Sequence, residues 1–338
     1  WLSVVPSVPT VSTFAGSTGG HADGAAENAK FNSPNGIVLD IVGNLYVADK
    51  ANHRIRKITP AGVVSTLAGS GVAGFADGTN TEAKFSSPGG IAIDNDGILY
   101  VSDWGNHKIR KITPAGVVST LAGSTLGFAN GNGEVAKFNY PLGLDVDGDG
   151  NVYVADHNGR RIRKITPSGV VSTFAGSGAS SSVDGTGIAA AFKYPSDIVI
   201  DTAGNLYVTS NYGHKIRKIS PSGEVTTIAG SGVAGFADGT GTAAKFYHPS
   251  GIVVDKSGNL YVADNTNHKI RKITPAGVVS TFAGLTTGYT DGPSTDAKFK
   301  NPMSIAIDAS GNFYVGDAGN HKIRKISSGF DLIGNPTE

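Results

Sequence analysis

The sequence predicts an all-β protein made of six copies of one four-stranded unit. The first observation is that the tripeptide Val-Ser-Thr, or Val-Thr-Thr in one copy, recurs at intervals of 53 or 54 residues. Its copies begin at Val11, Val64, Val118, Val171, Val225 and Val279. The second is that Gly supplies 48 of the 338 residues, about twice its average usage, and Pro another 15. This composition is typical of many tight turns between short strands rather than of long helices.

Each unit contains four short runs with strand-like composition. In the first unit these runs are Gly36–Asp40, Asn44–Asp49, His53–Ile58 and Val63–Ala68. Turn residues separate them: Gly43 can adopt the positive φ of a bulged hairpin, and Pro60 suits the second position of a type I turn. A four-stranded unit that is apolar on both faces cannot bury itself alone. We therefore expect the six units to pack radially as the blades of a six-bladed β-propeller.

The phase of the repeat predicts how the ring closes. Val11–Ala15 is a fourth strand with no first three before it, and Ile305–Ile326 supplies three strands with no fourth after them. Pairing the two segments completes the last blade and removes exposed sheet edges. We therefore expect a single propeller over residues 11–327, a leader or linker at 1–10, a tail or linker at 328–338, and a monomeric ring.

A longer motif within each unit resembles a known repeat. Tyr46–Ile58 reads Tyr-Val-Ala-Asp-Lys-Ala-Asn-His-Arg-Ile-Arg-Lys-Ile, and near copies stand at Tyr100–Ile112, Tyr261–Ile273 and Tyr314–Ile326. This motif resembles the NHL repeat, named for its Asn-His-Leu stretch, and the resemblance covers about residues 11 to 327. The third and fourth copies depart from it at 158–161 and 210–214. The resemblance implies a six-bladed propeller that most often serves as a non-catalytic binding module.

Residues that recur in nearly every unit are expected to be structural. An Asp ends the second strand of five units and Ser210 stands there in the fourth, so we expect an Asx-type turn that accepts backbone N–H groups. These residues are Asp49, Asp103, Asp156, Asp264 and Asp317. One His position also recurs five times, and we expect it to pack within the ring. Its copies are His53, His107, His214, His268 and His321.

Two carboxylates break the repeat close to the expected axis. Asp145 and Asp197 stand in the innermost strands, where other units have Val, Ala or Gly. Such a pair could bind a cation or act in acid/base chemistry. Together with His248 it would form a channel-mouth site. The resemblance to NHL proteins keeps that alternative open, because six-bladed lactonases and an amidating lyase similar to NHL proteins hold calcium or zinc on the axis. The plainer interpretation is a hydrogen-bonded or hydrated polar pair.

A short acidic stretch resembles half of a calcium loop. Asp145, Asp147 and Asp149 precede Gly150 in a D-x-D-x-D-G pattern, with Asp156 at the twelfth position. Yet Asp147, Gly150 and Asp156 are ordinary repeat residues, and the twelfth ligand of such loops comes from a helix. We therefore expect no metal and no cofactor, and calcium at Asp145, Asp147 and Asp149 is the alternative.

Positions that vary within a near-perfect repeat are those that the fold does not dictate. Propeller geometry places the link between the second and third strands on the same face as the start of the first strand. We assign to the links Lys50, Trp104, His157, Tyr212, Thr266 and Ala318. The residues just before the first strands are Ser33, Ser87, Tyr140, Tyr194, His248 and Asn301. Aromatic and His residues concentrate in blades two to five.

This concentration predicts a recognition surface, because rigid amphipathic rings supply contact area at low entropic cost. The alternative is that the rings only fill gaps between blades. We predict a partly exposed, ligand-binding face lined by Trp104, Tyr140, His157, Tyr194, Tyr212 and His248.

Charge and composition narrow the function classes. The net charge is +1 and the positive charges are spread around the ring, which argues against a nucleic-acid partner. No apolar run approaches the roughly 18 residues of a membrane span. The absence of Cys excludes disulfides and thiolate chemistry. The chain begins at Trp1 rather than Met, which is compatible with a processed or a trimmed N-terminus. For the location we expect an extracytoplasmic or secreted protein.

These observations favour a non-catalytic scaffold that presents one propeller face to a protein, peptide or glycan. The alternative is a metal-assisted lyase or hydrolase with a site at the mouth of the central channel.

Overall fold

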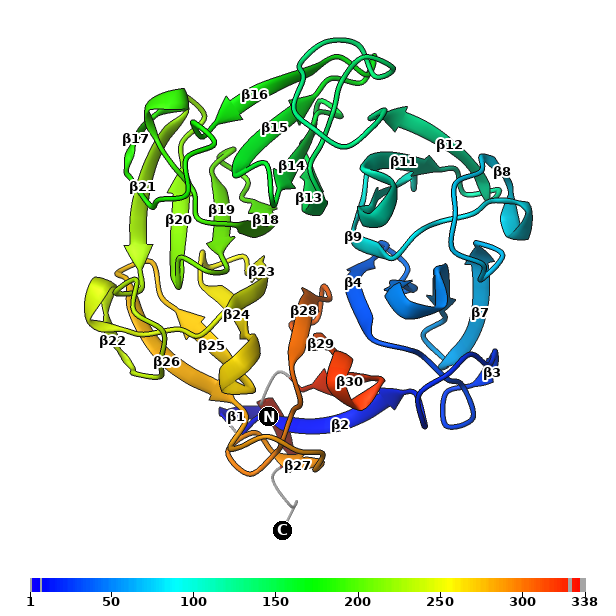
Figure 1. The fold of residues 1–338 in the computed structure, drawn as a ribbon. Helices are drawn as coiled ribbons and strands as arrows, with labels where there is room; N and C mark the ends of the chain where they lie inside the picture. Colours follow the sequence, from blue (N-terminus) through cyan, green and yellow to red (C-terminus); the bar gives the residue numbers. More distant parts are fainter. Residues whose placement is uncertain (1, 7, 328–329, 335–338) are drawn as a thin grey trace.

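The computed structural model describes residues 2–6, 8–327 and 330–334 and shows six β-sheets arranged around a central axis (Figure 1). The prediction of an all-β, six-bladed propeller is confirmed. The helices of the described residues are 3-10 helices of three residues each, so none could cross a membrane. They are η1 (Lys50–Asn52), η2 (Asn80–Glu82), η3 (Trp104–Asn106), η4 (Gly187–Ala189), η5 (Gly241–Ala243), η6 (Asn265–Asn267) and η7 (Ala318–Asn320).

Each blade is an antiparallel sheet of four main strands that run outward from the axis in sequence order. Blade one holds β4 (Pro34–Leu39), β5 (Leu45–Asp49), β6 (Arg54–Ile58) and β7 (Val63–Ala68). Blade two holds β9 (Pro88–Ile93), β10 (Leu99–Asp103), β11 (Lys108–Ile112) and β12 (Val117–Ala122). Blade three holds β13 (Pro141–Val146), β14 (Val152–Asp156), β15 (Arg161–Ile165) and β16 (Val171–Ala175).

The other three blades repeat this order. Blade four holds β18 (Pro195–Ile200), β19 (Leu206–Ser210), β20 (Lys215–Ile219) and β21 (Glu224–Ala229). Blade five holds β23 (Pro249–Val254), β24 (Leu260–Asp264), β25 (Lys269–Ile273) and β26 (Val278–Ala283). Blade six holds β28 (Pro302–Ile307), β29 (Phe313–Asp317), β30 (Lys322–Ile326) and β2 (Thr10–Ala15).

A short fifth strand covers the outer edge of five blades. In each case the Gly-rich connection that leads into a blade first pairs for two residues with that blade's own fourth strand. These strands are β3 (Gly24–Ala25), β8 (Gly78–Thr79), β17 (Gly185–Thr186), β22 (Gly239–Thr240) and β27 (Gly292–Pro293). In blade three an isolated bridge between Gly131 and Val171 takes this place. The connection therefore protects an edge that four strands alone would leave open.

The ring closes through its N-terminal strand, as the phase of the repeat predicted. β2 pairs antiparallel with β30, with Val11 opposite Ile326, so residues 315 positions apart in sequence complete one sheet. Val11 is fully buried among residues of blades five and six. Beyond the ring, β1 (Leu2–Pro6) pairs with β31 (Phe330–Gly334), which joins the segments expected to be leader and tail.

The hydrophobic core is divided into six parts, each lying between two neighbouring blades. One part, for example, combines Ile270 and Ala283 of blade five with Phe299, Phe313 and Ile326 of blade six. Each blade contributes one fully buried Phe from the segment that precedes its first strand. The six are Phe31, Phe85, Phe138, Phe192, Phe246 and Phe299. Because each core part needs both of its blades, an incomplete last blade would expose apolar surface.

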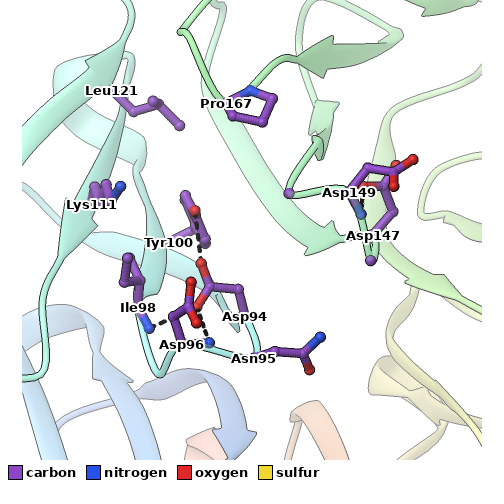
Figure 2. Close-up of a pocket in the computed structure, with 12 residues that line it drawn as sticks. Asp94, Asn95, Asp96, Ile98, Tyr100, Lys111, Leu121, Asp147, Asp149 and Pro167 are labelled. Atoms are coloured by element: carbon purple, nitrogen blue, oxygen red, sulfur yellow. Dashed lines mark hydrogen bonds between the residues drawn. The ribbon is translucent and has the colours of Figure 1, made fainter.

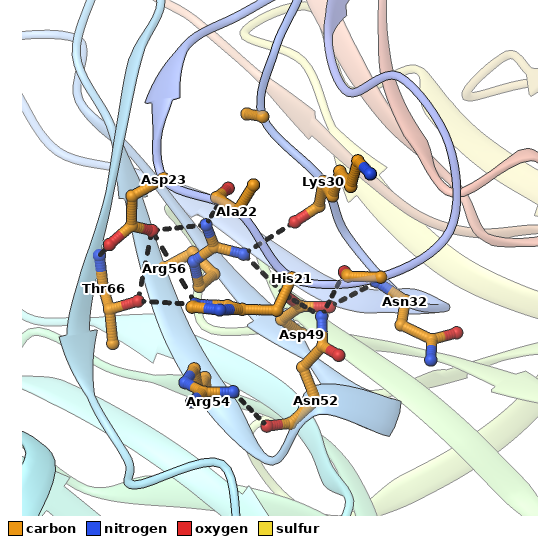
Figure 3. A network of polar contacts seen from close by, with 12 residues as sticks. His21, Ala22, Asp23, Lys30, Asn32, Asp49, Asn52, Arg54, Arg56 and Thr66 are labelled. Carbon is orange, nitrogen blue, oxygen red and sulfur yellow. Dashed lines mark hydrogen bonds and ion pairs between the residues drawn. The ribbon is translucent and has the colours of Figure 1, made fainter.

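A buried Arg in the third strand ties each blade together. In blade one, Arg56 is fully buried and forms ion pairs with Asp49 at 2.8 Å and with Asp23 at 2.5 Å (Figure 3). It also donates to the backbone carbonyls of Lys30 and Ala22, and its guanidinium lies over the Phe31 ring. One side chain thus links the third strand, the end of the second strand and the incoming connection.

This network corrects the role expected for the repeated Asp. Asp49 does not cap a local Asx turn: it accepts the backbone N–H of Asn32, 17 residues earlier, together with the Asn52 amide and Arg56. In blade four, Ser210 was expected to accept a backbone N–H more weakly, but its hydroxyl donates to the carbonyl of Lys193. Arg217 of that blade consequently keeps one carboxylate partner, Asp184.

The repeated His residues join neighbouring blades. The Nδ1 atom of His53 accepts the backbone N–H of Ser87 in the next blade at 3.0 Å, and His321 closes the ring by accepting that of Ser33. Blades two, four and five have the same contact. This supports the structural role expected for the His position. Blade three has Arg160 there instead, and its guanidinium donates to the Tyr194 hydroxyl at 3.0 Å.

The closure predicts the effect of a truncation. Removal of residues 1–16 deletes β2 and leaves β30 as an unpaired edge, so we expect a lower melting temperature and oligomers in size-exclusion chromatography. Removal of residues 1–6 deletes only β1 and is the matched control, which should stay a monomer with nearly unchanged melting. Equal behaviour of the two truncations would contradict closure through β2.

The Arg network predicts opposite effects of two reciprocal substitutions. Asp103→Ser in blade two leaves the buried Arg110 with only half-exposed Asp77, and we expect a loss of about 3–5 kcal/mol in the free energy of unfolding. Ser210→Asp in blade four should give Arg217 its missing partner and a gain of about 1 kcal/mol. Urea unfolding measures both, and a neutral Asp103→Ser would refute a stabilising network.

Candidate functional site

The links and the first-strand starts share one face of the propeller, which we call the link face. Pro34 lies opposite Asp49 in the ladder between β4 and β5, so the residues that precede one and follow the other are neighbours. The turns that join the first strand to the second and the third to the fourth lie on the opposite face, the turn face. The expected placement of links and starts on one face therefore agrees with the ladder.

In two blades the link residue selected from the sequence is the second residue of the link and not the first. The residue directly after the second strand is Asn211 in blade four and Asn265 in blade five, so Tyr212 and Thr266 lie one residue further along their links than Lys50 does in blade one. Side-chain contacts agree: His157, Asn211 and Asn265 each reach the carbonyl of the next blade's first-strand proline. The ring around the axis is therefore Lys50, Trp104, His157, Asn211, Asn265 and Ala318.

The six predicted aromatic and His residues, which we call the aromatic arc, lie in blades two to five and form two groups of contacting rings. Trp104 and Tyr140 have ring centroids 4.5 Å apart. A second run of contacts joins His157 to Tyr194 at 5.3 Å, Tyr194 to Tyr212 at 5.0 Å and Tyr212 to His248 at 4.7 Å. Tyr212 is 48% exposed and the other five side chains are partly buried. Ligand binding by the arc stays a prediction.

The backbone at three arc positions is unfavourable for the residues that occupy it. Tyr140, Tyr194 and His248 precede the first strands with φ values of 55°, 55° and 53°. This left-handed conformation suits Gly or Asn, and a bulky side chain adopts it at an energetic cost. The equivalent residue has this left-handed conformation in all six blades, and in blade six it is Asn301. The backbone conformation therefore does not explain why Tyr or His stands at this position in three blades.

Two cations lie over rings of the arc. The Lys50 Nζ atom is 4.8 Å from the centroid of Trp104, and the guanidinium carbon of Arg160 is 4.9 Å from that of Tyr194. Burial lowers the pKa of Lys50. Burial likewise lowers the pKa of His157, with a smaller effect from the nearby Lys50 charge. Sequence reasoning did not select Arg160, although its signal was visible as an Arg where other blades have His.

The central channel is narrow because glycine lets the innermost strands approach closely. A Cβ atom on Gly36 would lie 2.6 Å from the carbonyl oxygen of Gly89, and one on Gly251 would lie 2.5 Å from the Cα of Ser304. On the link side of this level the channel holds a cavity of about 20 Å³, and on the turn side one of about 170 Å³. Asp197 lines both cavities.

The two axial carboxylates each hold a neighbouring blade. Asp145 accepts the backbone N–H of Ile200 at 2.8 Å, and Asp197 accepts that of Ile252 at 3.1 Å. These N–H groups belong to innermost strands that have no further strand to pair with. Burial raises the pKa of Asp145 to about 6 and that of Asp197 to about 7. The contacts favour the hydrogen-bonded polar pair over the catalytic pair.

The calcium-like motif does not assemble into one site. Asp145 faces the channel, whereas Asp147 accepts the backbone N–H groups of Asp149 and Asn151 in its own hairpin turn. Asp147 and Asp149 line a separate cavity of about 310 Å³ on the turn face, across from Asp94 and Asp96 of blade two (Figure 2). Within the described residues, no three His, Asp or Glu side chains are grouped so as to hold a metal ion.

Comparison with known proteins agrees with this fold. A sequence model of the NHL repeat matches residues 31–58, 85–112, 138–165 and 246–273. NHL repeat-containing protein 2 of Homo sapiens is 30% identical over an alignment of 333 residues, which covers 86% of this chain and 46% of that protein. The chain spans less than half the length of the first curated relatives it matches.

Two solved structures show the same architecture. An auxiliary nutrient binding protein from Bacteroides thetaiotaomicron has a TM-score of 0.72 at 20% identity, over 98% of this chain and 77% of that one. A virginiamycin B lyase from Staphylococcus aureus has a TM-score of 0.56 at 19% identity, over 90% of this chain and 85% of that one. At these identities the likeness shows the fold alone.

Four-stranded blades, a first-to-last closure and a link face with varied residues define a six-bladed β-propeller. The repeated Asp-x-x-Asn-His and Ile-Arg-Lys-Ile positions, together with the matched segments, identify the repeat. The chain belongs to the NHL-repeat family.

The raised pKa of Asp197 predicts how stability depends on pH. Because its folded pKa lies above the unfolded value near 4, the folded state holds more protons between pH 4 and 7, and the free energy of unfolding falls as pH rises through this window. Asp197→Asn keeps an acceptor for Ile252 without titrating. We expect the variant to gain on the order of 3 kcal/mol relative to wild type between pH 4 and 8, measured by urea unfolding. Parallel pH profiles would contradict the shift.

Proposed function

We propose that this chain is a non-catalytic interaction module that presents its link face to a peptide or protein partner, with a glycan as the second ligand class. The observation that carries the proposal is the aromatic arc. Its rings contact one another in two groups, remain partly exposed, and stand at positions that the scaffold leaves free to vary. Exposed rings of this kind dominate binding energy where they enter an interface.

The backbone supports the proposal independently. Tyr140 and Tyr194 occupy left-handed positions at an energetic cost that Asn would avoid. Such a cost is typical of positions where a side chain serves a purpose other than stability. Blades one and six, outside the arc, have the small or polar residues Ser33 and Asn301 at the same place. The rings are thus confined to one sector of the link face.

The alternative of a metal-assisted lyase or hydrolase finds less support. Asp145 and Asp197 are engaged with backbone N–H groups of neighbouring blades. His248, the third member of that expected site, stacks among Tyr212, Tyr247 and His214 on the link face. Its Nδ1 atom contacts the Thr266 hydroxyl.

A double substitution separates binding from folding. Tyr140→Asn with Tyr194→Asn removes two rings and relieves the backbone, so we expect an unchanged or higher melting temperature. Peptides from a displayed library and glycans from an array, selected on the wild type, should lose roughly tenfold to a hundredfold in affinity for the variant.

Ser33→Asn is the matched control, because it introduces Asn at the equivalent backbone position of blade one, outside the arc. It should leave affinity unchanged. Selected ligands that bind the double variant as tightly as wild type would refute the proposed surface. Recovery of no ligand from either library would refute it as well.

A further inference from the structure

The cations of the aromatic arc differ from the other buried cations of this protein. Each of the six third-strand Arg residues has at least one Asp partner within 3.2 Å. Lys50 and Arg160, by contrast, have no carboxylate within 4.0 Å in the part of the chain that the structure describes. Lys50 and Arg160 thus lack the carboxylate partner that every third-strand Arg has, although each lies over an aromatic ring.

The surroundings of Lys50 show a positive charge without an internal acceptor. Its Nζ atom lies over Trp104, and among the described residues no hydrogen-bond acceptor lies within reach of it. Lys108, Lys269 and Lys322 offer a contrast, because each donates to two backbone carbonyls. A ring face compensates only part of the hydration that a buried ammonium loses.

Arg160 is similarly incomplete. One terminal nitrogen donates to the Tyr194 hydroxyl. The Nε atom is buried without a partner, as it also is in the six third-strand Arg residues, so the missing carboxylate is what distinguishes Arg160 from them. Every other blade has a His at this position, where it serves the blade contact. The change to Arg keeps a contact with the next blade, through the Tyr194 hydroxyl, and adds a permanent positive charge to the link face.

We propose that the arc binds an acidic peptide segment, whose carboxylates pair with Lys50 and Arg160 while its apolar side chains lie on the intervening rings. This inference rests on the proposed function and specifies the chemistry of its ligand. The peptide supplies the carboxylates that pair with Lys50 and Arg160. Its apolar side chains contact the rings that lie between these two cations.

A carboxylate suits this surface better than a phosphate polymer. Lys50 offers one point charge, and Arg160 has part of its fork committed to Tyr194. Two separated single charges match two carboxylates, whereas a nucleic acid draws its affinity from many phosphate contacts along a basic surface. The lowered pKa of Lys50, caused by burial, agrees with a charge that lacks an anion nearby.

The positive charge of Lys50 beside Trp104 can be detected without a ligand, by the quenching of Trp fluorescence. The chain has two Trp residues, so Trp1→Phe leaves Trp104 as the single Trp, whose emission is selected by exciting at a wavelength that Tyr does not absorb. We expect iodide to quench Trp104 more strongly than neutral acrylamide does, and Lys50→Met to lower the iodide quenching constant roughly twofold while the acrylamide constant stays unchanged.

Lys57→Met is the matched control, because Lys57 lies over Tyr46 in the same kind of contact at 5.6 Å, beside the turn face. It should leave both quenching constants unchanged. An iodide constant that is insensitive to Lys50 would overturn the inference.

The peptide chemistry is tested with a matched pair of probes. One is an acetylated, amidated hexapeptide of alternating Glu and Phe, and the other carries Gln in place of Glu. We expect the Glu peptide to bind at least tenfold more tightly, by Trp104 fluorescence and by calorimetry, and to lose this advantage with Lys50→Met combined with Arg160→His. Arg160→His restores the repeat residue, so folding should be preserved.

The remaining outcomes separate this inference from the proposed function. Equal affinity of the two peptides, or no binding of either, overturns the acidic ligand. Neutral ligands that are selected on the wild type and lost with Tyr140→Asn and Tyr194→Asn would then still support the interaction module. Tighter binding of a uridine decanucleotide than of the Glu peptide also overturns the inference and favours a nucleic-acid partner.

Discussion

The buried Arg of the third strand is the interaction on which this propeller depends. It joins three segments of a blade through two carboxylates, two backbone carbonyls and a Phe ring, as Arg56 does in blade one. A charge this deeply buried is stabilising only while its partners are in place, so the network enforces one arrangement of the connection, the second strand and the third. Six copies give six blades of nearly identical shape, and identical shape is what allows a ring to close.

In such a uniform scaffold, the residues that differ from blade to blade are concentrated on the link face. The strands and turns repeat with little change, while the residues that ring the axis on the link face are Lys50, Trp104, His157, Asn211, Asn265 and Ala318. These side chains sit at the ends of strands whose geometry is already determined, so they can vary at small cost to folding. The blades that depart most from the repeat, three and four, are also those that contribute Arg160, Tyr194 and Tyr212 to the arc. The blades that differ most from the repeat therefore also provide candidate ligand-binding residues.

Two carboxylates that resemble functional groups have structural roles in this propeller. Asp145 and Asp197 have the raised pKa values expected of functional carboxylates, yet each satisfies an N–H group of the next blade's innermost strand. An inner strand has a free edge, and a side chain from the adjacent blade is the nearest group able to pair with it. Perturbed pKa values thus mark structural contacts at the axis, whereas the two candidate binding charges, Lys50 and Arg160, lie over rings of the link face.

The sequence by itself determined the blade number, the strand order and the closure, because these follow from the period and phase of a repeat and need no knowledge of contacts. It also indicated the aromatic residues of blades two to five, since deviations from a repeat are visible in one chain. Only the tertiary structure decided what the repeated Asp and His contact, because their partners lie in distant segments: Asn32 and Arg56 for Asp49, and Ser87 of the next blade for His53. It alone showed that Tyr212 and Thr266 are the second residues of their links, because this depends on where the second strand ends. It alone showed that Lys50 and Arg160 lack carboxylate partners among the described residues, because a missing contact is a property of three-dimensional neighbours and not of sequence spacing.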